Sequence, residues 1–236
     1  MGAALRIIPV LDLKGGEVVR AEKGERDRYR PIVTPLSASS DPVAVAEGLR
    51  RRHAFPIFYV ADLDAIEGRA PNSAALARLR AMQDAPELWV DAGIADAERL
   101  TALLGDQSIR PVLGSESQQD DGLLRRFGDL PGLILSLDFF DDGFHGPASF
   151  LDESELWPQR VIVMTLARVG SGAGPDFERL KEIKAKAGGR SVIAAGGVRN
   201  AADIGMLASL GIAGAMVATS LHDGTLTPEQ LASFGA

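Results

Sequence analysis

Cysteine is absent from the 236 residues of this chain. Its absence excludes disulfide bonds, thiolate metal sites and a cysteine nucleophile. No apolar run approaches the roughly 18 residues that a membrane-spanning helix needs. The apolar segment 7–11 stops at Asp12, so no secretory signal is predicted. We therefore expect a soluble cytoplasmic protein.

Positive charge is scarce relative to negative charge. The 25 Lys and Arg residues stand against 32 Asp and Glu, a formal net charge of −7 at pH 7. This balance argues against nucleic acid or an anionic membrane as a partner. It does not argue against a small anionic ligand, because the local field of a site can differ from the total charge. Monomeric and homo-oligomeric states both stay open.

Metal-ligand spacing is absent as well. His53, His145 and His222 lie far apart in the sequence, and none of them has the spacing of a zinc site. Four carboxylates are ligands of the type that Mg²⁺ takes, at Asp12, Asp62, Asp91 and Glu116. The favoured interpretation has no metal. No cofactor is expected either, since the glycine-rich segment 170–175 matches neither a P-loop nor a dinucleotide fingerprint.

The sequence does contain a regular alternation of short apolar runs and helical patterns. The runs have the length of buried strands, at residues 6–13, 57–61, 88–90, 111–113, 133–137, 161–164, 191–194 and 215–217. The helical patterns cover residues 42–52, 73–82, 96–104, 120–127, 176–187, 201–210 and 228–234, with Asp41, Asp96, Asp176 and Asn200 as predicted N-caps. This order predicts a parallel sheet with right-handed crossovers in one domain spanning 1–236. The 26 glycines suit its many tight turns.

An internal repeat favours a closed barrel over an open sheet. Residues 90–97 (VDAGIADA) resemble residues 194–201 (AAGGVRNA), 104 positions later, and residues 114–115 resemble 218–219 at the same offset. Residues 11–13 resemble 137–139 at a larger offset, so the first half has a longer loop after its first strand. We therefore predict an α/β fold, a (β/α)8 TIM barrel made of two similar half-barrels.

Several motifs carry a family resemblance. Residues 8–20 (IPVLDLKGGEVVR) resemble the opening of HisA and HisF, the histidine-biosynthesis barrels, and residues 59–65 (YVADLDA) resemble their second strand. Residues 137–138 and 195–198 resemble their fifth and seventh strands. The resemblance covers essentially the whole chain. It implies a phosphorylated small-molecule substrate, since HisA isomerises a ribonucleotide bearing two phosphates by an Amadori rearrangement and HisF cyclises a related ligand.

The chain departs from that family at several loops. Val169 stands where the sixth loop of HisA has a catalytic aspartate. Asp91 and Glu116 end the third and fourth strands, where the family has glycine and Gly-Thr-Ala motifs, and Ala218 replaces a glycine of the eighth. These features resemble a HisA/HisF-related subgroup of methane- and methanol-using microbes. That likeness implies a role in the synthesis of a C1-carrier cofactor of the methanopterin or methanofuran type.

Asp12 and Asp138 are the predicted catalytic residues. Each ends a buried strand, on opposite sides of the predicted barrel. Partial desolvation there raises the pKa of a carboxyl group, so one aspartate can give a proton while the other takes one. Aldose–ketose isomerisation needs such a pair. The alternative is that each carboxylate caps a loop or pairs with a lysine such as Lys14.

The phosphate site is predicted after the seventh and eighth strands. Gly196 and Gly197 begin a strand-to-helix turn, and exposed N–H groups at such a turn bind phosphate. Ala218, Thr219 and Ser220 add further donors. The alternative is a plain tight turn.

The opposite side of the barrel differs in charge. Two carboxylates, at Asp91 and Glu116, repel a phosphate, so we expect a ligand with one phosphate and a hydroxyl, amine or cation at this side. The alternative has Glu116 in solvent and Asp91 packed against Arg20. Further ligand contacts are predicted at Arg20, Asp62, Gly114, Ser115, Thr165 and Arg168.

Three functions stay open at this point. The first is an isomerase that acts on a phosphorylated sugar through Asp12 and Asp138. The second is a lyase or condensing enzyme that acts on a monophosphate in cofactor biosynthesis. The third is a non-catalytic barrel that binds a phosphorylated ligand. Retention of both aspartates argues against the third, and Val169 argues against orthodox HisA activity.

Overall fold

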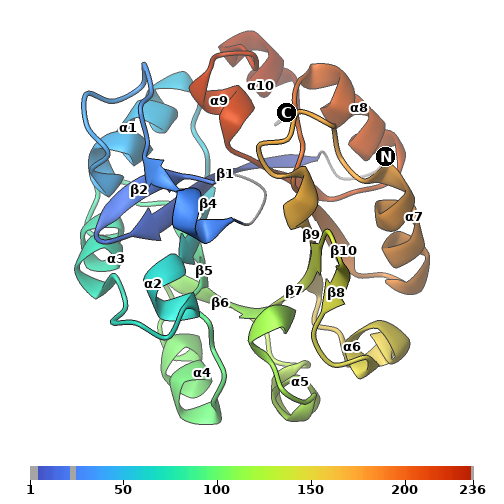
Figure 1. Ribbon diagram of the computed structural model, residues 1–236. Coiled ribbons are helices and arrows are strands. Elements are labelled where there is room, and N and C mark those ends of the chain that lie inside the picture. The colour runs from blue at the N-terminus through green and yellow to red at the C-terminus, as the bar shows by residue number, and fades with distance from the viewer. Residues whose placement is uncertain (1–4, 22–24, 235–236) are drawn as a thin grey trace.

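The computed structural model describes residues 5–21 and 25–234, and its centre is a closed ring of parallel strands (Figure 1). The ring consists of β1 (Arg6–Lys14), β4 (Ile57–Asp62), β5 (Glu87–Asp91), β6 (Ile109–Gly114), β7 (Ile134–Phe140), β9 (Arg160–Thr165), β10 (Ser191–Ala195) and β11 (Gly214–Val217). β11 pairs in parallel with β1, with Arg6 opposite Gly214, and so closes the ring. The predicted TIM barrel is confirmed.

Helices surround the ring and cover its outer face (Figure 1). They are α1 (Pro42–Arg52), α3 (Ser73–Arg80), α4 (Ala97–Leu104), α5 (Gly122–Phe127), α7 (Phe177–Lys186), α8 (Ala201–Ser209) and α10 (Pro228–Phe234). The four predicted N-caps are confirmed, because Asp41, Asp96, Asp176 and Asn200 each accept a hydrogen bond from the N–H group three residues later. In the described part of the chain, no helix has the length and apolar character needed to cross a membrane.

Shorter elements lie at the strand ends and position the site. The long loop after β1 forms an antiparallel hairpin of β2 (Glu17–Arg20) and β3 (Arg30–Pro31), which are joined through a 3-10 turn, η1 (Arg26–Arg28). Another 3-10 turn, η2 (Ser115–Ser117), follows β6, and short helices α2 (Leu63–Ile66) and α9 (Thr219–His222) follow β4 and β11. After β7 the chain forms β8 (Gly143–His145), α6 (Ser149–Asp152) and η3 (Ser154–Leu156); η4 (Leu166–Arg168) follows β9.

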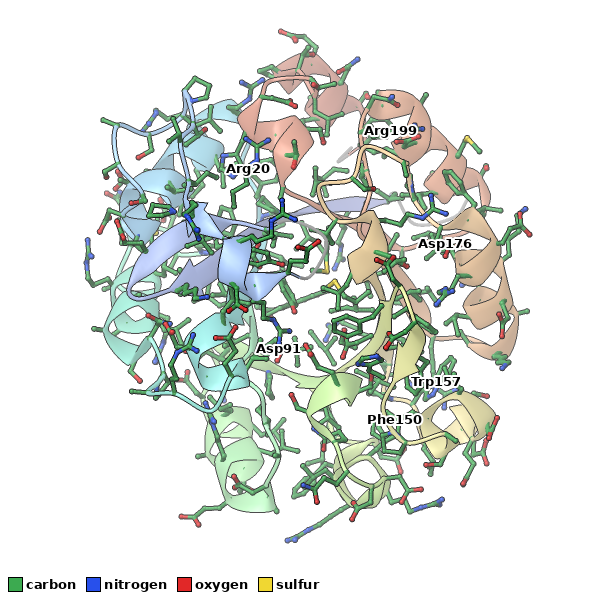
Figure 2. The ribbon with its side chains drawn as sticks, viewed as in Figure 1. Arg20, Asp91, Phe150, Trp157, Asp176 and Arg199 are labelled. Carbon is green, nitrogen blue, oxygen red and sulfur yellow. The ribbon has the colours of Figure 1, made fainter. Side chains whose placement is uncertain are left out.

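Side chains alternate between two hydrophobic clusters along each strand. Those facing outward pack under the helices, whereas those facing inward fill the ring, with Ile8, Tyr59, Trp89, Val112, Ile134, Ile162, Ile193 and Met216 among the latter. In Figure 2, Asp91 lies near the centre of the ring, while Phe150 and Trp157 lie at its periphery. Counting by two from Ile8, Trp89 and Ile134 reaches Asp12, Asp91 and Asp138. These three carboxylates therefore point inward at the C-terminal end of the ring.

Candidate active site

A cavity of about 460 Å³ lies at the C-terminal ends of the barrel strands. Most of the predicted site residues line it, namely Asp12, Arg20, Asp91, Glu116, Asp138, Arg168, Gly196, Gly197, Ala218, Thr219 and Ser220. The structure places Asp62, Gly114, Ser115 and Thr165 outside the cavity wall. The first group comes from both half-barrels, so the fold brings together residues more than 200 positions apart.

The alternation of side chains explains why three of these four residues lie outside the wall. Asp62, Ser115 and Thr165 each directly follow an inward-facing position, so their side chains point away from the ring. Asp62 is fully buried and accepts hydrogen bonds from the N–H groups of Ala65 and Asn72 and from Nδ2 of Asn72, at 2.7–3.1 Å. Asp62 thus caps α2 and holds a loop. Its side chain does not line the cavity.

Gly114 does face inward, but it has no side chain to reach the cavity. A Cβ on Gly114 would lie 3.1 Å from Oδ2 of Asp91 and 3.4 Å from Oδ2 of Asp138. The glycine, at the end of β6, therefore leaves room for two carboxylates that come from the strands on either side, β5 and β7.

Asp12 at the end of β1 is partly exposed and faces the cavity. Its side chain makes no hydrogen bond or ion pair with any residue in 5–21 and 25–234. Burial raises the pKa of Asp12 to about 7, although the positive charge of Arg26 lowers it. Lys14 does not pair with Asp12, because its ammonium group donates to the carbonyl of Arg26 at 2.8 Å. Asp12 is therefore a carboxyl group that can exchange a proton near neutral pH.

Asp138 lies across the ring from Asp12, because β7 is the fifth strand counted from β1. Its Oδ1 accepts a hydrogen bond from Ser136 at 2.6 Å, and its Oδ2 accepts one from the N–H of Glu116 at 3.1 Å. Ser115 accepts the Asp138 N–H at 2.9 Å and so positions the strand end. Burial raises the pKa of Asp138 to about 8, and the charges of Asp91 and Glu116 contribute to the rise.

Asp91 is buried beside these groups. Oδ1 accepts the N–H of Gly93 at 3.1 Å, and Oδ2 accepts the hydroxyl of Tyr59 at 3.3 Å. Burial raises the pKa of Asp91 to about 6, while the Gly93 hydrogen bond lowers it and the charge of Glu116 raises it. Burial, followed by the charges of Asp91, Asp138, Asp12 and Glu116, raises the pKa of Tyr59 well above its usual value, so the phenol remains a donor.

Arg26, on η1, reaches across the cavity to form an ion pair with Glu116. Burial lowers the pKa of Arg26, but the adjacent Glu116 carboxylate and then the charges of Tyr29 and Asp91 raise it, and the net shift is upward. This contact differs from the alternative in which Glu116 points into solvent. We call Asp91, Glu116, Asp138 and Arg26 the acidic end of the cavity.

The turns after β10 and β11 form the other end of the cavity. Gly196 and Gly197 have φ values of +100° and +84°, and a Cβ on either would lie 2.4 Å from a carbonyl oxygen, of Thr165 and Gly174 respectively. The N–H groups of Gly197, Val198, Thr219 and Ser220 donate to no acceptor among the described residues. Such N–H groups are the donors that bind an anion at a strand-to-helix turn. We call these four residues the amide end.

Basic residues near the amide end differ in whether their side chains are already paired within the protein. Arg199 is held by its own helix, because its side chain makes two hydrogen bonds of 2.9 Å to Asp203. Arg20 and Arg168 line the cavity, and neither has an ion-pair partner in the described part of the chain. Among the described residues, no hydrogen bond or ion pair joins Arg20 to Asp91. The charge of Arg20 instead acts on His222, whose pKa falls to about 4 mainly through burial and then through Arg20.

The cavity also contains residues to which the sequence analysis assigns no ligand contact. Arg26 is one, because it meets Glu116 across 90 positions and no local pattern marks such a pair. Tyr59 is another, although counting by two along β4 places it inward. Val169 lines the cavity on the loop after β9. In residues 5–21 and 25–234, no group of three or more His, Asp or Glu residues is arranged to hold a metal ion.

Comparison with known proteins yields one family. The family model described as histidine biosynthesis protein matches residues 6–227. A 1-(5-phosphoribosyl)-5-((5-phosphoribosylamino)methylideneamino) imidazole-4-carboxamide isomerase of Rubrobacter xylanophilus is 33% identical, over 95% of this chain and 94% of its own. An isomerase of the same name from Thermus thermophilus is 29% identical over 94% and 96%, and an uncharacterized protein of Methanocaldococcus jannaschii is 28% identical over 96% and 97%. With the fold and the strand-end site already in view, these matches show that the chain belongs to the histidine-biosynthesis protein family, the family of HisA and HisF.

Proposed function

We propose that this protein is an acid–base isomerase that converts a phosphorylated N-glycosylamine of an aldose into the corresponding aminoketose. The observation that carries the proposal is the position of Asp12 and Asp138 on opposite strands of one cavity, with pKa values of about 7 and about 8. At neutral pH, Asp12 is partly ionised and accepts a proton, whereas Asp138 is mostly protonated and donates one. Arg26 accounts for part of this difference, because its charge lowers the pKa of Asp12.

The reaction conserves all atoms of the substrate. Asp138 donates a proton to the ring oxygen, the bond from that oxygen to C1 breaks, and the nitrogen lone pair forms a C=N bond to C1. Asp12 removes the proton from C2, that electron pair forms the C1=C2 bond, and the electron pair of the C=N bond returns to the nitrogen, which gives an enaminol. Protonation at C1 and loss of the proton from the C2 hydroxyl group then give the ketose. The hydrogens lost at C2 and at its hydroxyl group equal those gained at C1 and at the ring oxygen, so the substrate undergoes no net oxidation or reduction.

The amide end is suited to hold the phosphate of this substrate. Four N–H groups without described acceptors, together with Arg20 and Arg168, supply donors and positive charge at the turns after β10 and β11. The imidazole-carboxamide isomerases among the relatives act on a compound whose name contains two phosphoribosyl groups. The isomerase reaction in the names of these relatives supports the proposed reaction class. It does not specify the substrate of this chain.

Turnover by the purified protein tests the proposal. Two substrates are compared: the imidazole carboxamide named for the relatives, and an N-aryl 5-phosphoribosylamine with one phosphate. We expect ketose formation from at least one, and a loss of about 10²- to 10⁴-fold in kcat for Asp12→Asn and for Asp138→Asn.

A matched control is Asp106→Asn, which removes an ion pair with Arg80 at the N-terminal side of the barrel and leaves the cavity intact. This variant should retain wild-type turnover. Absence of any ketose from both substrates, or full turnover by the two cavity variants, contradicts the proposal.

A further inference from the structure

We infer that the substrate carries a single phosphate. The acidic end of the cavity excludes a phosphate group and accepts a nitrogen or hydroxyl group that donates hydrogen bonds. Glu116 is the residue that sets this specificity. The inference deepens the proposed function and rests on it for the phosphate at the amide end.

The first observation is that two backbone donors of the acidic end, the N–H groups of Gly93 and Glu116, are already used. The 104-residue offset of the two half-barrels makes Gly93 the counterpart of Gly197 and Glu116 the counterpart of Ser220. At the acidic end, the Gly93 N–H donates to Asp91 and the Glu116 N–H donates to Asp138, both at 3.1 Å. At the amide end, the N–H groups of Gly197 and Ser220 donate to no described acceptor. The protein's own carboxylates thus satisfy donors that are open to a ligand on the opposite side.

The second observation is that the arginine at the acidic end is also occupied. Arg26 forms its ion pair with Glu116, and both side chains are largely buried, with exposed fractions of 21% and 17%. An arginine paired with a built-in carboxylate attracts a second anion weakly, because the charge is already compensated. Glu116 therefore takes the place that a ligand phosphate would need beside Arg26.

The third observation concerns what remains for a ligand at this end. Asp91 and Asp138 present oxygen atoms toward the cavity, as does Asp12 from the strand across the ring from Asp138, and Tyr59 already donates to Asp91. Carboxylate oxygens accept hydrogen bonds, and a phosphate with its negative charge offers them few donors. An amine, an amidine or a hydroxyl group offers those donors without charge repulsion. The acidic end therefore suits the part of the substrate remote from its phosphate.

Binding of simple probes tests the inference without any turnover. Three alkyl compounds of equal chain length are titrated by calorimetry into the wild-type protein: a monophosphate, an ω-amino monophosphate and an α,ω-bisphosphate. We expect the amino monophosphate to bind at least about 10-fold more tightly than the bisphosphate. Glu116→Gln frees Arg26 from its ion pair. In this variant, the ratio of the amino monophosphate affinity to the bisphosphate affinity should fall by about 10-fold or more.

Glu153→Gln is the control, because it removes a carboxylate from an exposed ion pair with Arg125 outside the cavity. It should leave the ratio unchanged. If the bisphosphate binds most tightly to the wild-type protein, or if a folded Glu116→Gln protein keeps the wild-type ratio, the inference is wrong while the isomerase proposal stands. If not even the plain monophosphate binds, the phosphate site of the proposed function fails instead.

Discussion

The acidic end and the amide end of the cavity have the same backbone plan and opposite chemistry. Both contain a glycine with positive φ after a strand, Gly93 at +60° and Gly197 at +84°, and both have a short helical turn after the next strand. At the acidic end, side-chain oxygens accept two of the N–H groups of these turns, those of Gly93 and Glu116. At the amide end, no described group does so.

The difference between the two ends follows from the side chains at two corresponding positions, which decide whether the backbone donors of a strand-end turn are satisfied within the protein. Asp91 corresponds in sequence to Ala195, and Glu116 corresponds to Ser220. A carboxylate at these positions satisfies the local donors from within, whereas a small side chain leaves them open to an external anion. Two similar half-barrels therefore present different hydrogen-bonding groups to the cavity, with carboxylate acceptors at one end and open N–H donors at the other.

The largest expected effect comes from Asp12, which lies between the two ends. Asp12→Asn should lower kcat for the proposed isomerisation by about 10³-fold, because an amide cannot accept the C2 proton. Affinity for an alkyl monophosphate should stay within about threefold of wild type, since the amide end is untouched. Steady-state kinetics and calorimetry measure the two quantities. A parallel loss of kcat and of monophosphate affinity would mean that Asp12 takes part in phosphate binding, and the two ends would then not be functionally separate.

Exchanging each glycine for alanine compares the two ends directly. Gly197→Ala places a Cβ 2.4 Å from the carbonyl oxygen of Gly174 and strains a residue with positive φ. We expect this variant to lose about 100-fold in alkyl monophosphate affinity, equivalent to about 2.7 kcal/mol. Gly93→Ala should destabilise the fold by a similar steric conflict with Ile66, yet the folded fraction should bind the monophosphate normally. Equal losses of affinity in the two variants would remove the functional difference between the turns.

The raised pKa values also predict how stability depends on pH. Asp138 has a pKa of about 8 in the folded protein against 3.8 for an unperturbed carboxyl, so between these values the folded state holds a proton that the unfolded state has lost. The free energy of unfolding therefore falls as pH rises through this window. Asp91 and Asp12 act in the same direction up to about 6 and about 7. The depressed pKa of His222 acts only at lower pH.

Between pH 7 and pH 8 the remaining slope belongs mainly to Asp138. Urea unfolding of the wild-type protein should lose on the order of 1 kcal/mol across this unit, the limit for one group being about 1.4 kcal/mol. Asp138→Asn should keep only the smaller loss that Asp12 causes, about 0.4 kcal/mol in the same interval, whatever its absolute stability. An unchanged slope in this variant would mean that another group at the acidic end carries the titration.

Local patterns in the sequence predict the barrel well and the contacts across it poorly. The eight strands and the N-caps at Asp96 and Asn200 follow from apolar runs and short-range hydrogen bonds, which depend on neighbouring residues alone. The pair of Arg26 and Glu116 depends on a hairpin folding over the cavity. Nothing in the sequence near either residue indicates it.

The orientation of strand-end residues follows from a short-range pattern as well. Tyr59 faces inward, so the period of two along β4 turns Asp62 outward, and the same count turns Ser115 and Thr165 away from the cavity. Ligand contacts are predicted at these residues from their place at strand ends alone, and that criterion does not distinguish the two faces of a strand. The period of two does distinguish the two faces. Counted from an inward-facing residue of its own strand, Asp12 falls on the inner face of β1 and Asp62 falls on the outer face of β4.

The smallest expected effect on ligand binding concerns the aspartates of β4 and α2, which lie outside both ends. Asn72 joins them, because its side-chain Nδ2 donates to Asp62 and to Asp64 at 2.8 Å and its Oδ1 accepts the N–H of Gly16 at 2.7 Å. Asn72→Ala removes these bonds, and we expect a loss of about 1–2 kcal/mol in the free energy of unfolding, since two carboxylates lose a donor. Urea unfolding measures that loss, and alkyl monophosphate affinity should not change. A large loss of monophosphate affinity with little loss in the free energy of unfolding would instead indicate that Asp62 contacts the ligand. The ligand site would then include the end of β4.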